Sequence, residues 1–347
     1  MIGSIHGWRQ VARRFRRRFA NRALILLYHR VVDLPSDPHL LAVTPAHFAE
    51  HLEVIRRWGR PMRLVDLCQS VAAGHIPHRA VVVTLDDGYV DNLTHATPLL
   101  EGAGVPATVF VTSGFVGRRR EFWWDDLDRL LLQPGRLPAT LRLTLDGAPW
   151  EAELGEAACY SLDDQHRDRH WSLEALADPG PRQRLFRSLF DRLRLVPDHE
   201  RRRALCELAE WAGASAEGRE THRALSEGEL IGLANSGAID IGAHTVTHSQ
   251  LSALPPSAQR DEIRESKARL EDLLGRPVTT FAYPFGGASH YTAETVTAVL
   301  DVGYISACAN IPDVVSRGVD LHQLPRFLVR DWDGDVFARR LDAWFSG

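Results

Sequence analysis

Six short apolar runs, rich in β-branched residues, alternate with segments of helical periodicity along this 347-residue chain. Nearly every residue in each run is hydrophobic, which is typical of parallel strands buried on both faces. The predicted strands are residues 23–28, 80–85, 107–111, 239–243, 279–283 and 304–307. The predicted helices are residues 45–58, 65–73, 92–102, 257–274, 293–300 and 336–345. The alternation predicts an α/β sheet or barrel built from βα repeats.

Residues 117–223 interrupt this rhythm with a stretch rich in Arg, Leu and Trp. Helical periodicity appears there at 181–195 and 201–212, and residues 141–150 are a candidate hairpin turning at Asp146-Gly147. We therefore predict a largely helical insertion or lid. The predicted organisation is an N-terminal segment at 1–22, a first barrel part at 23–116, the insertion at 117–223 and a second barrel part at 224–347.

The insertion contains the unusual run Phe122-Trp123-Trp124-Asp125-Asp126. It is either an aromatic platform for a sugar ring with a substrate-facing carboxylate, or a helix N-terminus that anchors the insertion to the barrel. Aromatic side chains more often pack than bind a ligand, so the anchoring role is favoured.

Composition excludes some classes of function and compartment. The net charge of -4 gives no case for nucleic-acid binding. Cys68, Cys159, Cys206 and Cys308 show no CxxC spacing and are expected to be reduced, buried residues, which fits a cytoplasmic protein. No stretch is long and apolar enough to cross a membrane, and no signal peptide is visible.

The first 22 residues combine aromatic and apolar positions at helical spacing with seven arginines. Such a basic amphipathic helix either lies on an anionic membrane surface or packs on the domain through its aromatic face. The first alternative would place the protein peripherally at the inner membrane surface.

Polar groups follow four of the predicted strands. His29 ends the first strand, Asp86 and Asp87 follow the second, His244 follows the fourth, and the turn-forming run Tyr283-Pro284-Phe285-Gly286 closes the fifth. Active sites of parallel α/β folds collect at the carboxyl ends of the strands. His244 and His248 share one face if their segment is helical. With one carboxylate they form a His₂Asp set, which leaves a metal position for water.

Asp86 and Asp87 are adjacent, so their side chains diverge if the segment is extended. One carboxylate can then bind the metal while the other accepts a proton from the water. This combination suggests metal-assisted hydrolysis.

With these motifs the chain resembles the polysaccharide deacetylases, the NodB-homology enzymes of carbohydrate esterase family 4. The run 85–88 (LDDG) is similar to their first motif, 244–248 (HTVTH) to the second and 281–286 (FAYPFG) to the third. The resemblance covers roughly residues 24–89 and 237–329 and implies a distorted (β/α) barrel.

The resemblance also implies roles, position by position. Asp87, His244 and His248 would hold the metal, and Asp86 would be the general base. The backbone amide of Phe285 would help to hold the oxyanion, where aimed donors contribute strongly to rate.

Two positions depart from the family pattern. The third motif usually carries an arginine that tunes the base, but this chain has Ala282 there. Arg326 is a candidate replacement that would hold Asp86 ionised, with a structural ion pair as the equal alternative.

The general-acid histidine usually comes from a late Leu-x-His motif, for which His322 is a weak candidate here. Residues 27–31 (LYHRV) instead resemble the permuted arrangement of the exopolysaccharide-deacetylase branch, which assigns His29 as general acid. Asp331 or Asp333 is a candidate to orient it.

These features together predict a metal-dependent hydrolase that removes N-acetyl groups from an amino sugar in a polysaccharide or glycan precursor. Zn²⁺ is the expected ion, and a His₂Asp set also accepts Co²⁺ or Ni²⁺. Two alternatives stay open: a metal-containing carbohydrate-binding protein that does not turn over, and a hydrolase of another linear amide or an O-acetyl ester.

Overall fold

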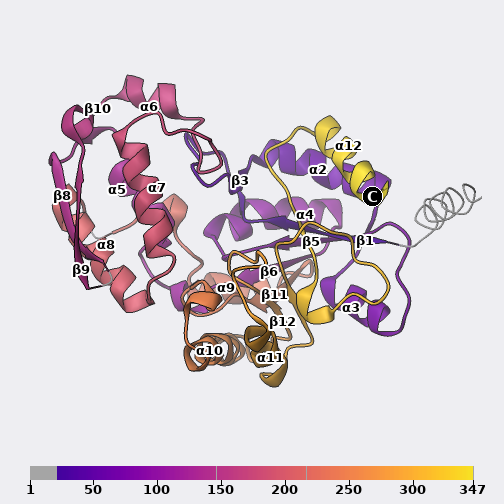
Figure 1. Cartoon of the computed structure of the whole chain (residues 1–347). Helices are drawn as coiled ribbons and strands as arrows, with labels where there is room; N and C mark the ends of the chain where they lie inside the picture. The colour runs from indigo at the N-terminus through magenta and orange to yellow at the C-terminus, as the bar shows by residue number, and fades with distance from the viewer. Residues whose placement is uncertain (1–21, 146, 216, 347) are drawn as a thin grey trace, which may run out of the picture.

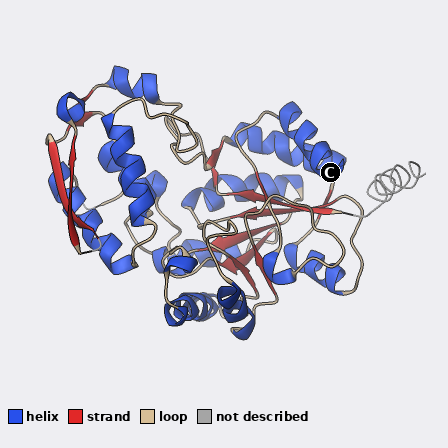
Figure 2. Ribbon diagram, viewed as in Figure 1, coloured by secondary structure: helices blue, strands red, loops and turns tan. Residues whose placement is uncertain are grey.

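The computed structural model describes residues 22–145, 147–215 and 217–346. Its central feature is a curled sheet with strands in the order β13-β12-β11-β6-β5-β1-β14 (Figure 1 and Figure 2). Every pairing in this sheet is parallel. The strands are β1 (Ala23–Tyr28), β5 (Ala80–Leu85), β6 (Ala107–Val111), β11 (Ile239–Ala243), β12 (Thr280–Ala282), β13 (Ser306–Cys308) and β14 (Phe327–Leu328), with β4 (Arg60–Pro61) beside β5.

One segment near the C-terminus joins the two edges of this sheet. Leu324 forms a parallel bridge with Cys308 of β13. Four residues later, Leu328 pairs with Leu27 of β1. A bent segment therefore closes the curled sheet, and the predicted distorted (β/α) barrel is confirmed.

Helices surround the sheet. They are α2 (Pro45–Trp58), α3 (Leu64–Ala72), α4 (Thr97–Ala103), α9 (Glu227–Ala234), α10 (Pro256–Leu274), α11 (Ala293–Asp301) and α12 (Gly334–Ser346). Helices α2 and α12 lie side by side although they come from opposite ends of the chain (Figure 1). No helix in the described part of the chain has the length and apolar character needed to span a membrane.

The helix predicted at 92–102 is divided in two. Residues Asn92–Ala96 form a π-helix, and α4 begins at Thr97. Pro98 has no amide hydrogen for a regular helical bond. The Thr97 amide reaches back five residues to the Asn92 carbonyl, as in the π-helical turns that often occur at functional sites.

The insertion lies to one side of the barrel (Figure 1, left), and its buried hydrophobic residues form a cluster separate from the barrel core. It contains α5 (Trp123–Leu131), α6 (Leu162–Asp168), α7 (Pro181–Leu193), α8 (Asp198–Ala212), the hairpin β8 (Thr140–Leu145) and β9 (Ala148–Glu153), and the pair β7 (Gly135–Arg136) and β10 (Cys159–Tyr160). The boundaries at 117 and 223 stay predictions. The hairpin was expected to turn at Asp146, which lies outside the described residues.

The cysteines are only partly as expected. All four are free, but only Cys68 and Cys308 are buried. The prediction was wrong for Cys159 and Cys206, which are exposed in the insertion. The basic N-terminal helix lies almost wholly outside the described residues.

Candidate active site

Because side chains alternate between the two faces of a strand, the polar residues that follow the strands face the barrel interior at one rim. Ile25, Val82 and Phe110 belong to the interior cluster. Side chains two residues apart on a strand face the same way, and this phase continues past the strand ends. His29 and Asp86 therefore lie above Ile25 and Val82, and both line one cavity.

That cavity has a volume of about 280 Å³. All seven residues proposed from the sequence line it, namely His29, Asp86, Asp87, His244, His248, Phe285 and Arg326. The rest of its wall is mainly apolar and includes Leu27, Leu41 and Leu328 from the barrel.

The Asp86 carboxylate is held by a buried arginine from the closing segment. Arg326 donates from its two terminal nitrogens to the two oxygens of Asp86, each at 2.7 Å. Burial alone would raise the pKa of Asp86, but Arg326, followed by His244, lowers it to about 2. Asp86 is therefore ionised near neutral pH, and Arg326 supplies the arginine partner that Ala282 cannot.

Asp87 is turned away from Asp86 by a tight turn and not by an extended segment. Its φ of 76° is left-handed, and the Gly88 amide donates to the Asp86 carbonyl. Both carboxylate oxygens of Asp87 are buried and have no hydrogen-bond partner in the described structure. A buried carboxylate without a partner is costly, so these oxygens are suited to a ligand.

Two imidazoles lie beside the free oxygens of Asp87. The Nε2 atoms of His248 and His244 are 3.3 Å and 3.6 Å from its Oδ1. Ligands about 2.0–2.1 Å from a tetrahedral zinc ion lie roughly 3.3–3.5 Å apart. The donor set and its spacing therefore fit one divalent ion.

The protonation states of the histidines suit this role. Burial, only partly opposed by Asp86, lowers the pKa of His244 to about 4. Burial and then Arg201 lower the pKa of His248 to about 3. His244 Nδ1 lies 2.7 Å from the Ala282 carbonyl, so its proton sits there and Nε2 stays free to bind. Both rings are neutral near pH 7, as metal ligands must be.

The segment between the two histidines is a loop, so the condition for a shared helix face is not met. Thr245 and His248 have left-handed φ values of 63° and 55°. The Thr245 hydroxyl accepts from the His248 amide at 3.0 Å and folds the loop back on itself. Such strained residues persist only where the surroundings fix them, and they cluster at functional sites.

His29 and Phe285 complete the set proposed from the sequence. His29 Nδ1 is buried without a hydrogen-bond partner in the described structure. Burial lowers the pKa of His29, while Asp87 and Asp86 act to raise it. Phe285 has a left-handed φ of 60°, and its ring packs 5.0 Å from that of His248.

The insertion forms one wall of the cavity through Trp124, Leu173, Glu174 and Phe190. At the mouth, Glu174 pairs with Arg330 of the barrel. Trp124 lies within the aromatic-acidic run, begins α5 with Trp123, and is 4% exposed. Its burial favours the anchoring role, although its ring also contacts His248 at 4.6 Å.

Several lining residues were not anticipated from the sequence. His39, His290 and Asn310 reach the cavity from loops, and no local pattern marks them. The proposed orienting residues lie elsewhere: Asp331 bonds Thr44 and His47, and Asp333 bonds the first turn of α12. His322 bonds the Tyr304 carbonyl and is absent from the cavity wall.

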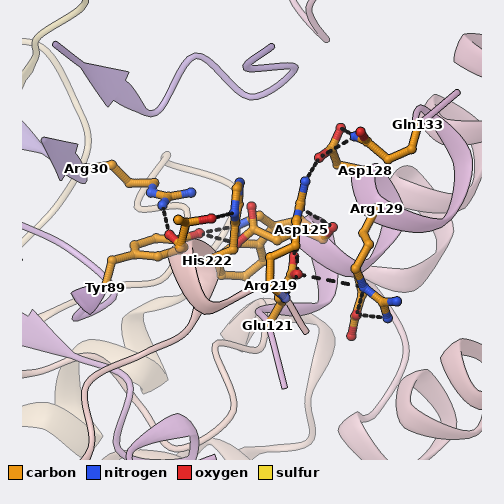
Figure 3. Close-up of polar contacts among 12 residues, drawn as sticks. Arg30, Tyr89, Glu121, Asp125, Asp128, Arg129, Gln133, Arg219 and His222 are labelled. Carbon is orange, nitrogen blue, oxygen red and sulfur yellow. Dashed lines mark hydrogen bonds and ion pairs between the residues drawn. The ribbon is translucent and has the colours of Figure 1, made fainter. Parts of the chain in front are cut away.

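A second cluster of buried charge joins the barrel to the insertion (Figure 3). Arg219 donates to Glu121 at 2.8 Å and to Asp128 at 2.7 Å. Arg30 donates to Asp91 at 2.9 Å. We call these five residues the seam cluster. Each of its carboxylates has an arginine partner, so none of them is left free to bind a ligand. Arg30 also donates to the Thr221 carbonyl, and this contact joins the barrel to the insertion.

Comparison with known proteins agrees with this geometry. The sequence model of the family named polysaccharide deacetylase matches residues 73–135 and 209–306. YxkH of Bacillus subtilis (strain 168), a protein provisionally named as a polysaccharide deacetylase, is 30% identical to this chain over 105 residues. That alignment covers 30% of this chain and 36% of the relative, little more than a third of its length.

Two solved structures share the fold over nearly the whole chain. The deacetylase PplD of Streptococcus pyogenes, in complex with acetate, has 15% identity and a TM-score of 0.56, covering 93% of this chain and 99% of that one. IcaB from Ammonifex degensii has 20% identity and a TM-score of 0.56, covering 94% and 98%. The two sequence matches, together with the barrel and its motifs, show that the chain is similar to the polysaccharide deacetylase family in both parts of the barrel.

Proposed function

We propose that this protein hydrolyses the N-acetyl group of an N-acetylated amino sugar in a glycan, with a divalent metal held by Asp87, His244 and His248. The observation that carries the proposal is the pair of buried Asp87 oxygens, which have no hydrogen-bond partner in the part of the chain that the structure describes and lie beside two neutral imidazoles. The PplD structure is described as that of a deacetylase bound to acetate, which supports the same reaction class here.

The ligand set favours Zn²⁺ and also accepts Co²⁺ or Ni²⁺. A divalent ion at such a site polarises a carbonyl and lowers the pKa of water. The remaining steps belong to side chains and backbone groups of this chain.

Asp86 is the general base. Its carboxylate is ionised because Arg326 lowers its pKa to about 2. An oxygen of Asp86 lies 3.9 Å from His244 Nε2, so the base borders the ligand set without belonging to it. It accepts the proton of the attacking water at a carboxylate oxygen.

The Phe285 amide and His29 act on the other atoms of the acetamide. The backbone conformation of Phe285 fixes the direction of its amide, which is proposed to donate to the carbonyl oxygen as negative charge develops. His29, in its imidazolium form, donates a proton to the departing amine nitrogen, and Asp87 and Asp86 favour that form by acting to raise its pKa against the effect of burial. Apolar side chains form much of the cavity wall around these groups.

The test is acetate release from N-acetylglucosamine oligosaccharides. Activity should vanish with a chelator, return with Zn²⁺, and fall at least about 100-fold in Asp86→Asn. Asp91→Asn is the matched control, since Asp91 is also a buried carboxylate paired with a buried arginine but does not line the cavity. Chelator-insensitive turnover, or full activity in Asp86→Asn, would contradict the proposal. Metal and saccharide binding without acetate release would favour the binding-protein alternative.

A further inference from the structure

A buried arginine of the insertion reaches the loop that carries both histidine ligands. Arg201 lies on α8 and is 1% exposed. Its terminal nitrogen donates to the Thr247 carbonyl at 3.0 Å, and its partner on α8, Asp198, lies 3.2 Å away. Thr247 directly precedes His248, so this hydrogen bond acts on the peptide that positions the ligand.

The two peptides that precede this one are held by the barrel. Glu262 of α10 accepts from the amides of Val246 and Thr247 at 2.8 Å and 2.9 Å, and from the Thr247 hydroxyl at 2.6 Å. The amide of Thr247 is thus fixed by the barrel and its carbonyl by the insertion.

This loop needs support from outside because its own conformation is unfavourable. Thr245 and His248 both have left-handed φ values, which residues other than glycine rarely adopt. The insertion makes a second contact through Trp124, whose ring packs on the His248 imidazole. The Trp124 indole is itself fixed by a 2.7 Å hydrogen bond to the Tyr89 hydroxyl.

We propose that the insertion completes the metal site, with Arg201 as a positioning residue that sets the orientation of His248. The inference rests on the metal site of the proposed function. It gives a role to residues 136–208, which lie outside the family match and include Arg201. Removing groups that orient a metal ligand typically weakens metal binding by about 10–100-fold.

The experiment measures the affinity of the purified full chain for Zn²⁺ by competition with a chromogenic chelator, together with the melting temperature of the metal-free protein. Arg201→Met should bind Zn²⁺ at least about 10-fold more weakly than the wild type. If Arg201→Met does not fold, Arg201→Gln is compared in the same way, because its shorter amide cannot span the same partners.

Arg182→Met is the matched control. Arg182 is also 1% exposed, but its hydrogen bonds go to carbonyls within the insertion, such as Leu131 and Ala158. It should lower the melting temperature and leave the Zn²⁺ affinity within about twofold. Arg202→Met removes a half-exposed arginine beside Asp198 and should change neither.

The outcomes separate the two proposals. Wild-type affinity in Arg201→Met, or in Arg201→Gln if the former does not fold, overturns the positioning role, as does an equal loss of affinity in Arg182→Met. A wild-type chain that does not bind Zn²⁺ overturns the metal site itself.

Discussion

The cavity and the seam both bury charged side chains that follow β5, yet they use them in opposite ways. In the seam cluster, Asp91 is paired with Arg30, and Glu121 and Asp128 are paired with Arg219. In the cavity, Asp86 is paired with Arg326, but the oxygens of Asp87 have no hydrogen-bond partner in the described structure.

This difference separates a structural use of charge from a chemical one. Removing one member of a satisfied buried pair leaves the other uncompensated, so the seam should matter for stability. A buried carboxylate without a partner lowers the stability of the metal-free protein. Binding of a cation to that carboxylate restores part of this stability. Asp87 should therefore matter for binding and catalysis.

The largest expected effect is the loss of activity in Asp87→Asn. Asparagine tolerates the left-handed conformation at this position, so the backbone is not strained further. Acetate release and zinc content should fall at least about 100-fold because the charged ligand is gone. Urea unfolding of the metal-free variant should show unchanged or higher stability, since a neutral amide is less costly to bury. A large loss of stability with zinc binding retained would make Asp87 a structural residue.

The next effect is on stability. Arg219→Met should lower the free energy of unfolding by about 3 kcal/mol because Glu121, a fully buried carboxylate, loses its close partner. Arg129, 3.7 Å from Glu121, is the cation that remains beside it. The folded fraction should keep its zinc and its turnover.

Arg119→Met is the control for Arg219→Met. Arg119 is 85% exposed and pairs with exposed Glu217, so its loss should change the free energy of unfolding by less than about 0.5 kcal/mol. Denaturant unfolding measures both variants. Equal stabilities of the two variants would contradict the role assigned to the seam.

The smallest effect is a pH dependence at the seam. Burial, followed by Arg30 and Arg219, lowers the pKa of His222 to about 2 in the folded chain (Figure 3). The pKa of an unfolded histidine is about 6.5, so the unfolded state binds more protons below that pH. Stability from His222 is therefore fully present above about pH 6.5 and is lost as the pH falls toward 2.

Urea unfolding between about pH 7 and pH 5 measures this contribution. His222→Gln should flatten the fall in stability by at most about 1.4 kcal/mol per pH unit. If the free energy of unfolding fell equally steeply with pH in the variant and the wild type, the contribution assigned to His222 would be contradicted.

The sheet was predictable because its signal is local. Apolar runs predicted β1, β5, β6 and β11 with correct bounds, and helical periodicity predicted α2 with correct bounds. The closing segment at Leu324–Leu328 was not predictable as such, because its two short pairings depend on strands at both edges of the sheet. The division at Asn92–Ala96 depends on a single proline, whose effect on helical register a periodicity pattern does not reveal.

The site was partly predictable for a related reason. Residues that follow parallel strands meet at one rim, so Asp86, Asp87 and His244 could be grouped from strand ends alone. The loop conformation of His248 could not be, because i and i+4 spacing is equally compatible with a helix. Arg201 has no local signal, since it bonds a carbonyl 46 residues away.

The sequence by itself determined the alternation of strands and helices, the order of the motifs and the chemical types that can bind a metal. These features depend on residue types and on the spacing between nearby residues, and both can be read directly from the sequence. Only the tertiary structure decided which arginine holds Asp86, since Arg326 lies 240 positions away. It also decided that Asp87 has no hydrogen-bond partner among the described residues while Asp91 is paired, because satisfaction of a buried charge depends on every neighbour that folding brings near.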